Sequence, residues 1–316
     1  MGAPREAWGV RSLERSAVKT GMIGLGEMGA AFVRRLHLAK REVVGYNRTK
    51  AKAESLIKEG MQFAATPREV VEQCEIICCM VTDDKAISAV TDGPDGALAA
   101  LRPGKVFVEM STISPAHERE LGERVLKTGA SFLDAPVSGS QLTVEQGKLL
   151  IMVGGDEAAF KKAEPVLLDI GPKVRLIGTI GQAKVMKIAL NLQLAVQMLA
   201  MSEGLLLAEK SGIPRALAYE MIASSALASP MIGYRGGFAV KMPDKAWFDV
   251  NMQQKDMKLA LELGRQVEVP LPTTAVANEM LTAARGMGFG DYDFAVLFHT
   301  LARMAGLDEH PAPPKA

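Results

Sequence analysis

The sequence predicts an α/β N-terminal domain with a mostly parallel sheet and an all-α C-terminal domain, joined by a long interdomain helix. Short apolar runs alternate with amphipathic segments from residue 18 to residue 180, a pattern typical of successive strand–helix–strand units. After residue 181 the strand-like runs stop, and helical patterns continue to residue 305. The segment 181–212 contains no proline and ends at Gly212, just before Pro214, so it predicts one helix of about thirty residues.

The elements follow from these patterns in order. In the first domain we expect strands at 18–24, 42–47, 63–66, 75–81, 105–111, 131–137, 149–155 and 174–178. The helices between them are expected at 30–40, 67–73, 85–90, 115–127 and 157–170. The second domain, 181–308, is expected to hold helices at 181–211, 214–226, 252–265 and 272–286, and a last one from Phe294. We expect residues 1–17 to be a disordered or loosely docked extension and 309–316 a disordered tail.

Composition limits the classes of function. The chain has 316 residues, is 48% apolar and carries a formal net charge of +1, as expected for a soluble globular protein with a sizeable core. Its 37 Lys and Arg nearly balance its 36 Asp and Glu without a long basic run, so we expect no nucleic-acid partner. Asn191, Gln193 and Glu203 are among the polar residues that interrupt the apolar stretch 188–208, so we expect no membrane span.

The cysteines bear on metal binding and on location. Cys74, Cys78 and Cys79 lie close together in an apolar, strand-like region, with no histidine or further cysteine at ligand spacing. This arrangement predicts neither a zinc site nor a disulfide framework. Residues 1–17 lack the apolar core of a secretory signal. We therefore expect a reducing compartment, the cytoplasm.

A glycine-rich turn predicts a dinucleotide site. Gly24, Gly26 and Gly29 form a G-x-G-x-x-G pattern that follows a predicted strand and opens a predicted helix. In such a turn the first glycine makes the bend, the second admits the pyrophosphate, and the third lets the helix pack against the strand. The helix amino terminus then faces the phosphates. We therefore expect a Rossmann-type domain over 18–180, with cofactor contacts from Gly24, Leu25, Gly26, Glu27, Met28 and Gly29.

The end of the second strand indicates which cofactor binds. Enzymes that use NAD usually place Asp or Glu there to hold the ribose hydroxyls, whereas this chain has Asn47, Arg48 and Thr49. No carboxylate repels a 2′-phosphate here, and Arg48 can pair with one. We therefore expect NADP(H) to be preferred. The alternative stays open that Arg48 is a solvated residue and that NAD(H) binds as well.

Two further strand ends should border the same crevice, because ligands of parallel α/β sheets bind at the carboxyl ends of the strands. One carries Met80, Val81 and Thr82, and the other carries Thr112. Ser114 directly precedes a proline and is a good N-cap for the next helix. This leaves Thr112 to contact the nicotinamide or its ribose.

A polar stripe on the long helix is the candidate catalytic group. Lys184, Lys187 and Asn191 are spaced i, i+3 and i+7, so they share one face of a helix that is otherwise apolar on almost every side. We expect this helix to be buried, and a buried ammonium is costly unless it is paired or sheds its proton. Lys187 therefore suits a general acid/base. We expect Lys184, which lies near the helix start, to reach solvent. For Lys187 the alternative stays open that its side chain also extends to solvent and has no catalytic role.

With these residues assembled, the chain resembles the β-hydroxyacid dehydrogenase family over residues 18–306. GMIGLGEMGAAF resembles the family's cofactor fingerprint, and DAPVSGS (134–140) resembles its substrate loop. Gly178, Gly181, Lys187 and Asn191 match its catalytic lysine motif, while Lys255-Asp256 and 290–294 match two further motifs. The chain departs from the family at Ser140, Ala183, Leu190 and 141–146. Because these positions surround the substrate, its identity stays open.

The resemblance implies an NAD(P)-dependent dehydrogenase or reductase for a small carboxylate-bearing 3-hydroxy acid or semialdehyde. Lys187 would be the general acid/base, with its pKa lowered by burial and by the charges of Lys184 and Lys255. Asn191 would orient substrate or lysine, and Lys255 would also contact the cofactor. The backbone amides of Ser138, Gly139 and Ser140 would hold the substrate carboxylate. The family also implies a homodimer or homotetramer built on the helical domain.

Two other classes of protein stay open. Imine reductases share this architecture and use NADPH, but typically have another residue at the position of Lys187. A non-catalytic relative that binds the cofactor and only scaffolds partners would be expected to lose Lys187 and Asn191, and this chain has both.

Overall fold

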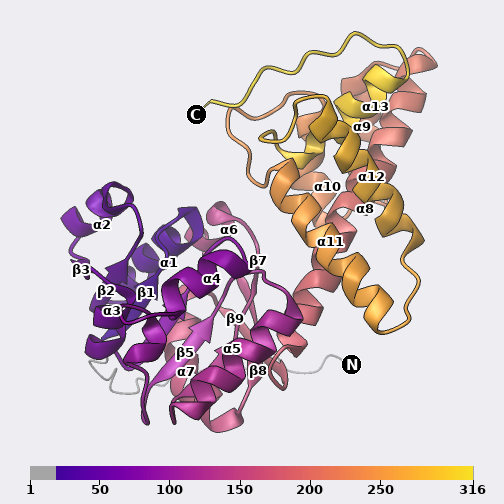
Figure 1. Ribbon diagram of the computed structural model, residues 1–316. Coiled ribbons are helices and arrows are strands. Elements are labelled where there is room, and N and C mark those ends of the chain that lie inside the picture. The colour runs from indigo at the N-terminus through magenta and orange to yellow at the C-terminus, as the bar shows by residue number, and fades with distance from the viewer. Residues whose placement is uncertain (1–18, 316) are drawn as a thin grey trace, which may run out of the picture.

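The computed structural model describes residues 19–315 and contains an α/β domain and a helical domain, with the longest helix running from one into the other (Figure 1). The last strand of the first domain, β9, ends at Gly178, and the long helix, α8, spans Gln182–Lys210. Strands and helices alternate before this point, and helices alone follow it. The predicted extension, 1–17, lies outside the described residues.

One sheet holds the first domain together. Its strands are β1 (Thr20–Ile23), β2 (Val43–Tyr46), β3 (Gln62–Phe63), β4 (Ile76–Cys79), β5 (Val106–Glu109), β6 (Ser131–Asp134), β7 (Val137–Ser138), β8 (Leu150–Gly155) and β9 (Lys173–Gly178). They lie in the order β3-β2-β1-β4-β5-β6-β8-β7, with β9 also pairing with β8. All pairs from β3 to β6 are parallel. The strand order reverses between β1 and β4, so the crevice for a ligand lies at the carboxyl ends of these two strands.

Helices cover both faces of this sheet because successive strand residues point to opposite sides. Met22 and Cys78 face one core, which is closed by α1 (Glu27–Leu38), α6 (Gln141–Glu145) and α7 (Glu157–Ile170). Ile23 and Ile77 face the other core, which is closed by α3 (Pro67–Gln73), α4 (Asp84–Thr91) and α5 (Pro115–Lys127). A short helix, α2 (Glu54–Lys58), follows β2. The Rossmann-type arrangement predicted from the sequence is confirmed.

Local signals account for the element boundaries. Ser114 caps α5 as predicted, since its Oγ accepts a hydrogen bond from His117 N at 3.2 Å. The predicted strand at 131–137 is instead two strands, β6 and β7, with Pro136 between them. Proline has no N–H to donate to a ladder, so the strand breaks there and β7 turns to pair antiparallel with β8.

The second domain is built around α8. Its other helices are α9 (Arg215–Ser224), α10 (Pro230–Arg235), α11 (Val250–Gln266), α12 (Pro272–Gly286) and α13 (Leu297–Met304). All five of them pack against α8, while the first turns of α8 pack against α5, β8 and β9 of the other domain. The sequence did not predict α10. This helix has only six residues, too few to show a period, and Ser229 begins it by accepting a hydrogen bond from Ile232 N.

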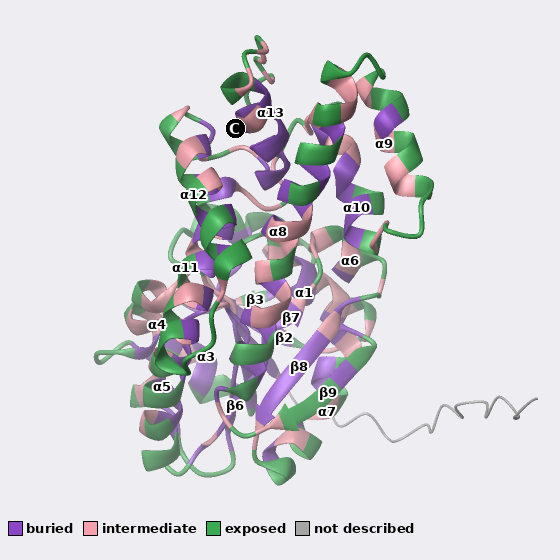
Figure 2. Ribbon diagram, turned by 90° about the vertical axis from the view of Figure 1, so that its right-hand side faces the viewer, coloured by how far each residue is buried: buried purple, intermediate pink, exposed green. Residues whose placement is uncertain are grey.

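The helix α8 is less enclosed than predicted. By length and composition it is the one helix within residues 19–315 that could cross a membrane, yet it forms the spine of the helical domain. Figure 2 shows buried and exposed residues alternating along it. The side chains of Val185, Met186 and Leu207 are 38%, 39% and 73% exposed. The prediction of burial on almost every face is therefore wrong, because composition does not reveal which faces the same chain covers.

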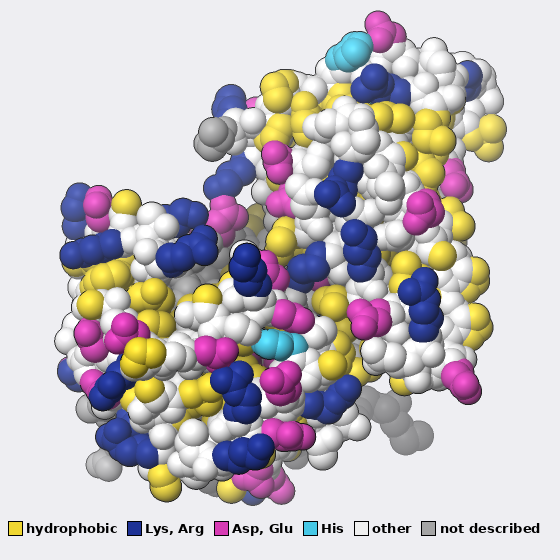
Figure 3. All heavy atoms as spheres, in the orientation of Figure 1, with side chains coloured by type: hydrophobic (Ala, Val, Ile, Leu, Met, Phe, Trp, Pro, Cys, Tyr) yellow, Lys and Arg dark blue, Asp and Glu magenta, His cyan; other side chains and the backbone are white. Residues whose placement is uncertain are grey.

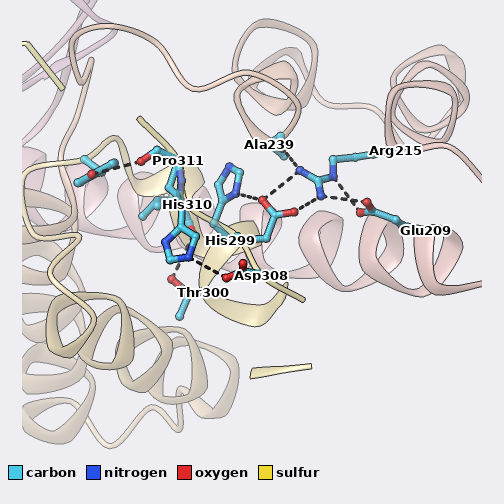
Figure 4. A network of polar contacts seen from close by, with 11 residues as sticks. Glu209, Arg215, Ala239, His299, Thr300, Asp308, His310 and Pro311 are labelled. Carbon is cyan, nitrogen blue, oxygen red and sulfur yellow. Dashed lines mark hydrogen bonds and ion pairs between the residues drawn. The ribbon is translucent and has the colours of Figure 1, made fainter. Parts of the chain in front are cut away.

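The C-terminal tail, which we expected to be disordered, forms no helix or strand but is attached to the helical domain (Figure 1). Figure 4 shows Arg215 of α9 and His299 of α13 in one network of polar contacts, and both contact Glu309 of the tail. Arg215 forms ion pairs with Glu309 and with Glu209 at the end of α8, and His299 Nδ1 lies 2.7 Å from Glu309 Oε2. Through Glu309 the tail therefore joins three helices of the domain.

Candidate active site

The glycine-rich turn between β1 and α1 has the shape that a pyrophosphate needs. Gly24 has a φ of +91°, and a Cβ there would lie 2.1 Å from Met80 O. A Cβ at Gly29 would lie 2.0 Å from Gly24 O, so the helix and the strand pack without room for a side chain. Beside Gly26 there is nothing within 4 Å. This open, exposed cradle at the start of α1 fits a nicotinamide dinucleotide.

The other predicted residues of this turn lie as follows. Leu25 is buried, whereas Glu27 and Met28 begin α1, with Met28 half-buried against the core. Glu27 is half-exposed and forms an ion pair with Lys245 of the helical domain. Lys245 carries no motif that could be found in the sequence, and its ion pair with Glu27 places a cation of the second domain beside the phosphate cradle.

The end of β2 is tied to the glycine turn. Asn47 Oδ1 accepts a hydrogen bond from Leu25 N at 3.0 Å, and Asn47 Nδ2 donates to Thr49 O at 2.9 Å. Arg48 and Thr49 are exposed, so both are available to a ligand in the crevice. The surface is hollowed between the two domains, and Lys and Arg side chains gather on the part of the α/β domain beside this hollow (Figure 3).

The ends of β4 and β5 are joined to each other. Val81 N donates to Ser111 Oγ at 2.8 Å, and Ser111 N donates to Glu109 Oε1 at 2.8 Å. Met80 is half-buried, while Thr82 is exposed and donates its hydroxyl to Asp83, the N-cap of α4. The carbonyl of Thr112 accepts a hydrogen bond from Lys255 Nζ of α11. Thr112 and Lys255 therefore meet across the two domains at the edge of the crevice.

Lys187 is buried and forms no pair with another residue of the described part of the chain. It is 8% exposed, and within residues 19–315 its ammonium takes part in no hydrogen bond or ion pair. Burial lowers its pKa to about 8. Asp256 opposes this shift, and the positive charges of Lys255 and Lys184 add to it. This is the direction that the sequence predicted, and it places proton exchange at Lys187 near neutral pH.

Asn191, one turn after Lys187, is held in place from α11. Its Nδ2 donates to Asp256 Oδ2 at 2.5 Å, and its backbone carbonyl accepts a hydrogen bond from Gln253 Nε2 at 3.1 Å. Lys255 Nζ lies 3.0 Å from Asp256 Oδ1. Asp256 thus binds Asn191 and is the carboxylate whose charge acts on Lys187. The Lys255-Asp256 pair was visible in the sequence, but the contact with Asn191 was not, since it joins two helices far apart in the chain.

The prediction that Lys184 reaches solvent is wrong. This side chain is 0% exposed, and its Nζ lies 2.5 Å from Glu109 Oε2 and 3.6 Å from Glu118 Oε1. The first turn of α8 begins against the carboxyl edge of the sheet rather than at the surface. Carboxylates from β5 and α5 therefore contact the Lys184 ammonium, which the sequence predicted to be in contact with water.

The substrate loop lies next to the start of α8. Ser138 is in β7, which packs against α8, and Gly139 is exposed with a φ of +142°. Ser140 N donates to Thr143 Oγ1 at 3.1 Å, as part of the capping box that begins α6. The amide of Ser140 is therefore already used within the loop, which corrects the expectation that three consecutive amides are available to a carboxylate.

Comparison with known proteins shows the family of this chain. A model of the NAD binding domain of 6-phosphogluconate dehydrogenase matches residues 19–178, and one described as NAD-binding of NADP-dependent 3-hydroxyisobutyrate dehydrogenase matches 181–301. Glyoxylate/succinic semialdehyde reductase 1 of Arabidopsis thaliana is 33% identical over 284 residues, which cover 90% of this chain and 98% of the relative. The chain belongs to the β-hydroxyacid dehydrogenase family.

Two more relatives agree with this assignment. The chloroplastic glyoxylate/succinic semialdehyde reductase 2 of the same plant is 33% identical over 91% of this chain and 80% of its own length. The crystal structure of a 3-hydroxyisobutyrate dehydrogenase from Salmonella typhimurium aligns with a TM-score of 0.82 and 28% identity, covering 89% of this chain and 99% of that one. This member of the β-hydroxyacid dehydrogenase family is thus an oxidoreductase that uses a nicotinamide cofactor.

Proposed function

We propose that this enzyme transfers hydride between NADP(H) and the aldehyde or carbinol carbon of a small carboxylate-bearing semialdehyde or 3-hydroxy acid, with Lys187 as general acid/base. The observation that carries the proposal is the state of Lys187. Lys187 is 8% exposed, pairs with no group within residues 19–315 and has a pKa of about 8. A structural lysine would be paired, as Lys184 is.

The chain's own residues divide the work of the reaction. The bound nicotinamide supplies or accepts the hydride. In reduction the Lys187 ammonium donates a proton to the carbonyl oxygen, and in oxidation the neutral amine takes the proton from the hydroxyl. Asn191 is fixed by Asp256, so its amide is a rigid partner for the substrate beside Lys187. Lys255, bound to Thr112 and Asp256, holds α11 against the cofactor domain.

The cofactor and substrate class rest on separate features. Arg48 and Thr49 offer a guanidinium and a hydroxyl to a 2′-phosphate, and no carboxylate lies between Tyr46 and Lys50 to compete for them. NADP(H) is therefore the preferred cofactor, with NAD(H) bound more weakly. The amides of Ser138 and Gly139 lie in the substrate loop next to α8 and suit a carboxylate. The names of the two plant relatives favour an aldehyde substrate of this kind.

The exposed apolar residues of α8 favour a homodimer or a homotetramer. Val185, Met186 and Leu207 of α8, with Leu217 and Met221 of α9, are each more than a third exposed. Such side chains on the central helix of a domain are ordinarily covered. A second copy of the helical domain would cover them. We also place the enzyme in the cytoplasm.

A substrate panel tests the function. NADPH oxidation is measured with glyoxylate, succinic semialdehyde, tartronate semialdehyde and methylmalonate semialdehyde, and with a set of cyclic imines. We expect turnover on the carboxylate-bearing aldehydes. Lys187→Ala should lower kcat by about 100-fold to 10,000-fold, the usual contribution of a general acid, with little change in NADPH affinity. The exposed Lys258 provides a control, because Lys258→Ala should leave kcat unchanged.

The outcomes separate the alternatives. Turnover of imines alone would place the chain with the imine reductases. No turnover on either set, with NADPH still bound, would favour a cofactor-binding scaffold. Near wild-type turnover by Lys187→Ala would remove Lys187 from the chemistry.

A further inference from the structure

A buried charge cluster lies at the junction of the two domains, outside the residues proposed to contact substrate. It consists of Lys184 at the start of α8, Glu109 at the end of β5, Glu118 in α5 and Asp134 at the end of β6, and is called the Lys184 cluster below. All four side chains are 0% exposed. Four ionisable groups without contact with water are costly to bury, so their arrangement calls for a reason.

The contacts fix α8 to the edge of the sheet at two points. Lys184 Nζ lies 2.5 Å from Glu109 Oε2 and also donates to Glu109 O at 3.1 Å. The backbone amide of the same residue donates to Asp134 Oδ2 at 3.2 Å. Both the main chain and the side chain of one helical residue are thereby held by neighbouring strands, β5 and β6.

The excess negative charge of the cluster falls from two to one when one carboxyl keeps its proton. Three carboxylates around one ammonium would leave two negative charges buried without compensation. Burial, and then the nearby Glu109 and Asp134, raise the pKa of Glu118 well above its ordinary value, although Lys184 opposes this. A protonated Glu118 can donate a hydrogen bond to Glu109, whose Oε2 otherwise meets only Lys184. The closest ion pair of the cluster is then Lys184–Glu109, and Asp134 accepts a hydrogen bond from the backbone amide of Lys184.

This pair continues into the cofactor crevice. Glu109 Oε1 accepts a hydrogen bond from Ser111 N, and Ser111 Oγ accepts one from Val81 N, each at 2.8 Å. An unbroken chain of contacts thus runs from the loop after β4, which borders the cofactor, to the first turn of α8. Lys187 follows Lys184 by three residues, so both lie on one face of the helix.

We infer that Lys184 is a positioning residue, which through Glu109 and Ser111 holds the catalytic helix and the cofactor-binding loop in one fixed geometry. The inference rests on the proposed function, because it takes Lys187 as the proton carrier. A small displacement of a reacting group costs a large factor in rate. The alternative is that the cluster only stabilises the fold.

The charges around Lys187 give the inference a second readout. The groups that act on its ammonium are Asp256 and Lys255 of α11 and Lys184 of its own helix, and Glu109 is not among them. Removing Lys184 and Glu109 together therefore removes one repelling cation from Lys187. A neighbouring positive charge disfavours an ammonium, so its loss should raise the pH at which Lys187 gives up its proton.

The test uses the full-length double variant Lys184→Met/Glu109→Gln, which replaces the pair by neutral groups of similar size. Such a replacement of a buried ion pair is commonly tolerated by a fold. We expect a cooperative thermal transition and a kcat about 10-fold to 100-fold below wild type. We also expect the pH limb, which is the pH range over which the kcat/KM for reduction falls, to move upward by about half a pH unit. Wild-type kcat with an unmoved limb would overturn the inference.

A second variant keeps the inference testable if the double variant does not fold. Ser111→Ala removes the contact with Val81 N and leaves the ion pair intact. It should raise the KM for NADPH severalfold without moving the pH limb, and an unchanged KM would overturn the inference. Lys105→Met is the matched control: this buried lysine, at the opposite end of β5, donates to Val71 O and Cys74 O. It should lower stability without changing kcat or the limb.

A parallel Lys187→Ala variant separates this inference from the proposed function. If Lys187→Ala retains turnover, the proposed function fails, whatever the double variant shows. If Lys187→Ala is inactive while Lys184→Met/Glu109→Gln keeps both the wild-type kcat and the wild-type limb, only the positioning role fails.

Discussion

The pH dependence of the two reaction directions is the sharpest test of the site. The pKa of Lys187 is lowered from 10.5 to about 8. This shift of about 2.5 units corresponds to about 3 kcal/mol in favour of the neutral amine. At pH 7 about ten in eleven molecules would carry the ammonium, and at pH 9 about one in eleven. Reduction needs the ammonium, whereas oxidation needs the amine.

The expected magnitudes follow from these populations. Between pH 7 and pH 9 the kcat/KM for reduction should fall about tenfold, and the kcat/KM for oxidation should rise about tenfold and approach a plateau. An unperturbed lysine would leave the reductive value flat over this range. Initial rates of NADPH oxidation and NADP+ reduction in one buffer series of constant ionic strength measure both profiles.

Asp256→Asn perturbs the same quantity in a known direction. The charge of Asp256 raises the pKa of Lys187. Neutralising it should therefore move the fall of the reductive profile and the rise of the oxidative profile, the two limbs, to lower pH by about one unit. Glu262→Gln, an exposed change on the same helix, should leave the limbs in place. A reductive profile that is flat from pH 7 to pH 9, or an upward shift in Asp256→Asn, would refute the assignment of the limb to Lys187.

Two further predictions concern the cofactor and the tail. Arg48→Asp should raise the KM for NADPH about tenfold or more while changing the KM for NADH little, because it replaces a phosphate partner with a repelling charge; an equal effect on the two cofactors would reject this role. Glu309→Gln should lower Tm at pH 7. Burial opposes a low pKa for Glu309, but the hydrogen bonds from Arg215 and His299 outweigh it and lower the pKa. The stabilisation from this carboxylate is therefore present above the ordinary Glu pKa and is lost as the pH falls. The Tm gap between variant and wild type should narrow as the pH falls below the ordinary Glu pKa and close once the pH passes the lowered pKa of Glu309, and a constant gap would mean that charge is not the cause.

Much of the fold followed from local patterns, because those patterns act over short distances. The glycine turn, the cap at Ser114 and the long proline-free helix each depend on neighbouring residues, and each was found where the sequence put it. The short elements α6 and α10 were missed because five and six residues do not span enough turns to show a period. The break at Pro136 was overlooked because the apolar run continues through it.

The site was harder to predict where contacts join distant segments. Spacing alone put Lys187 and Asn191 on one face of α8. It could not show that Asp256 binds Asn191, since that contact depends on how α11 packs. It also could not show that some apolar faces of α8 stay exposed, because composition does not reveal which faces the rest of the chain covers.

The two lysines of α8 show what decides the chemistry of a buried lysine in this enzyme. They share a helix, a face and nearly complete burial. Burial favours the neutral amine in both, yet Glu109, Glu118 and Asp134 raise the pKa of Lys184, while that of Lys187 falls to about 8. The difference lies in the facing groups: three carboxylates of the α/β domain surround the first lysine, whereas the second meets one carboxylate, Asp256, and the like charges of Lys255 and Lys184. The tertiary fold therefore raises the pKa of Lys184 and lowers that of Lys187, which is the state that the proposed proton transfer needs.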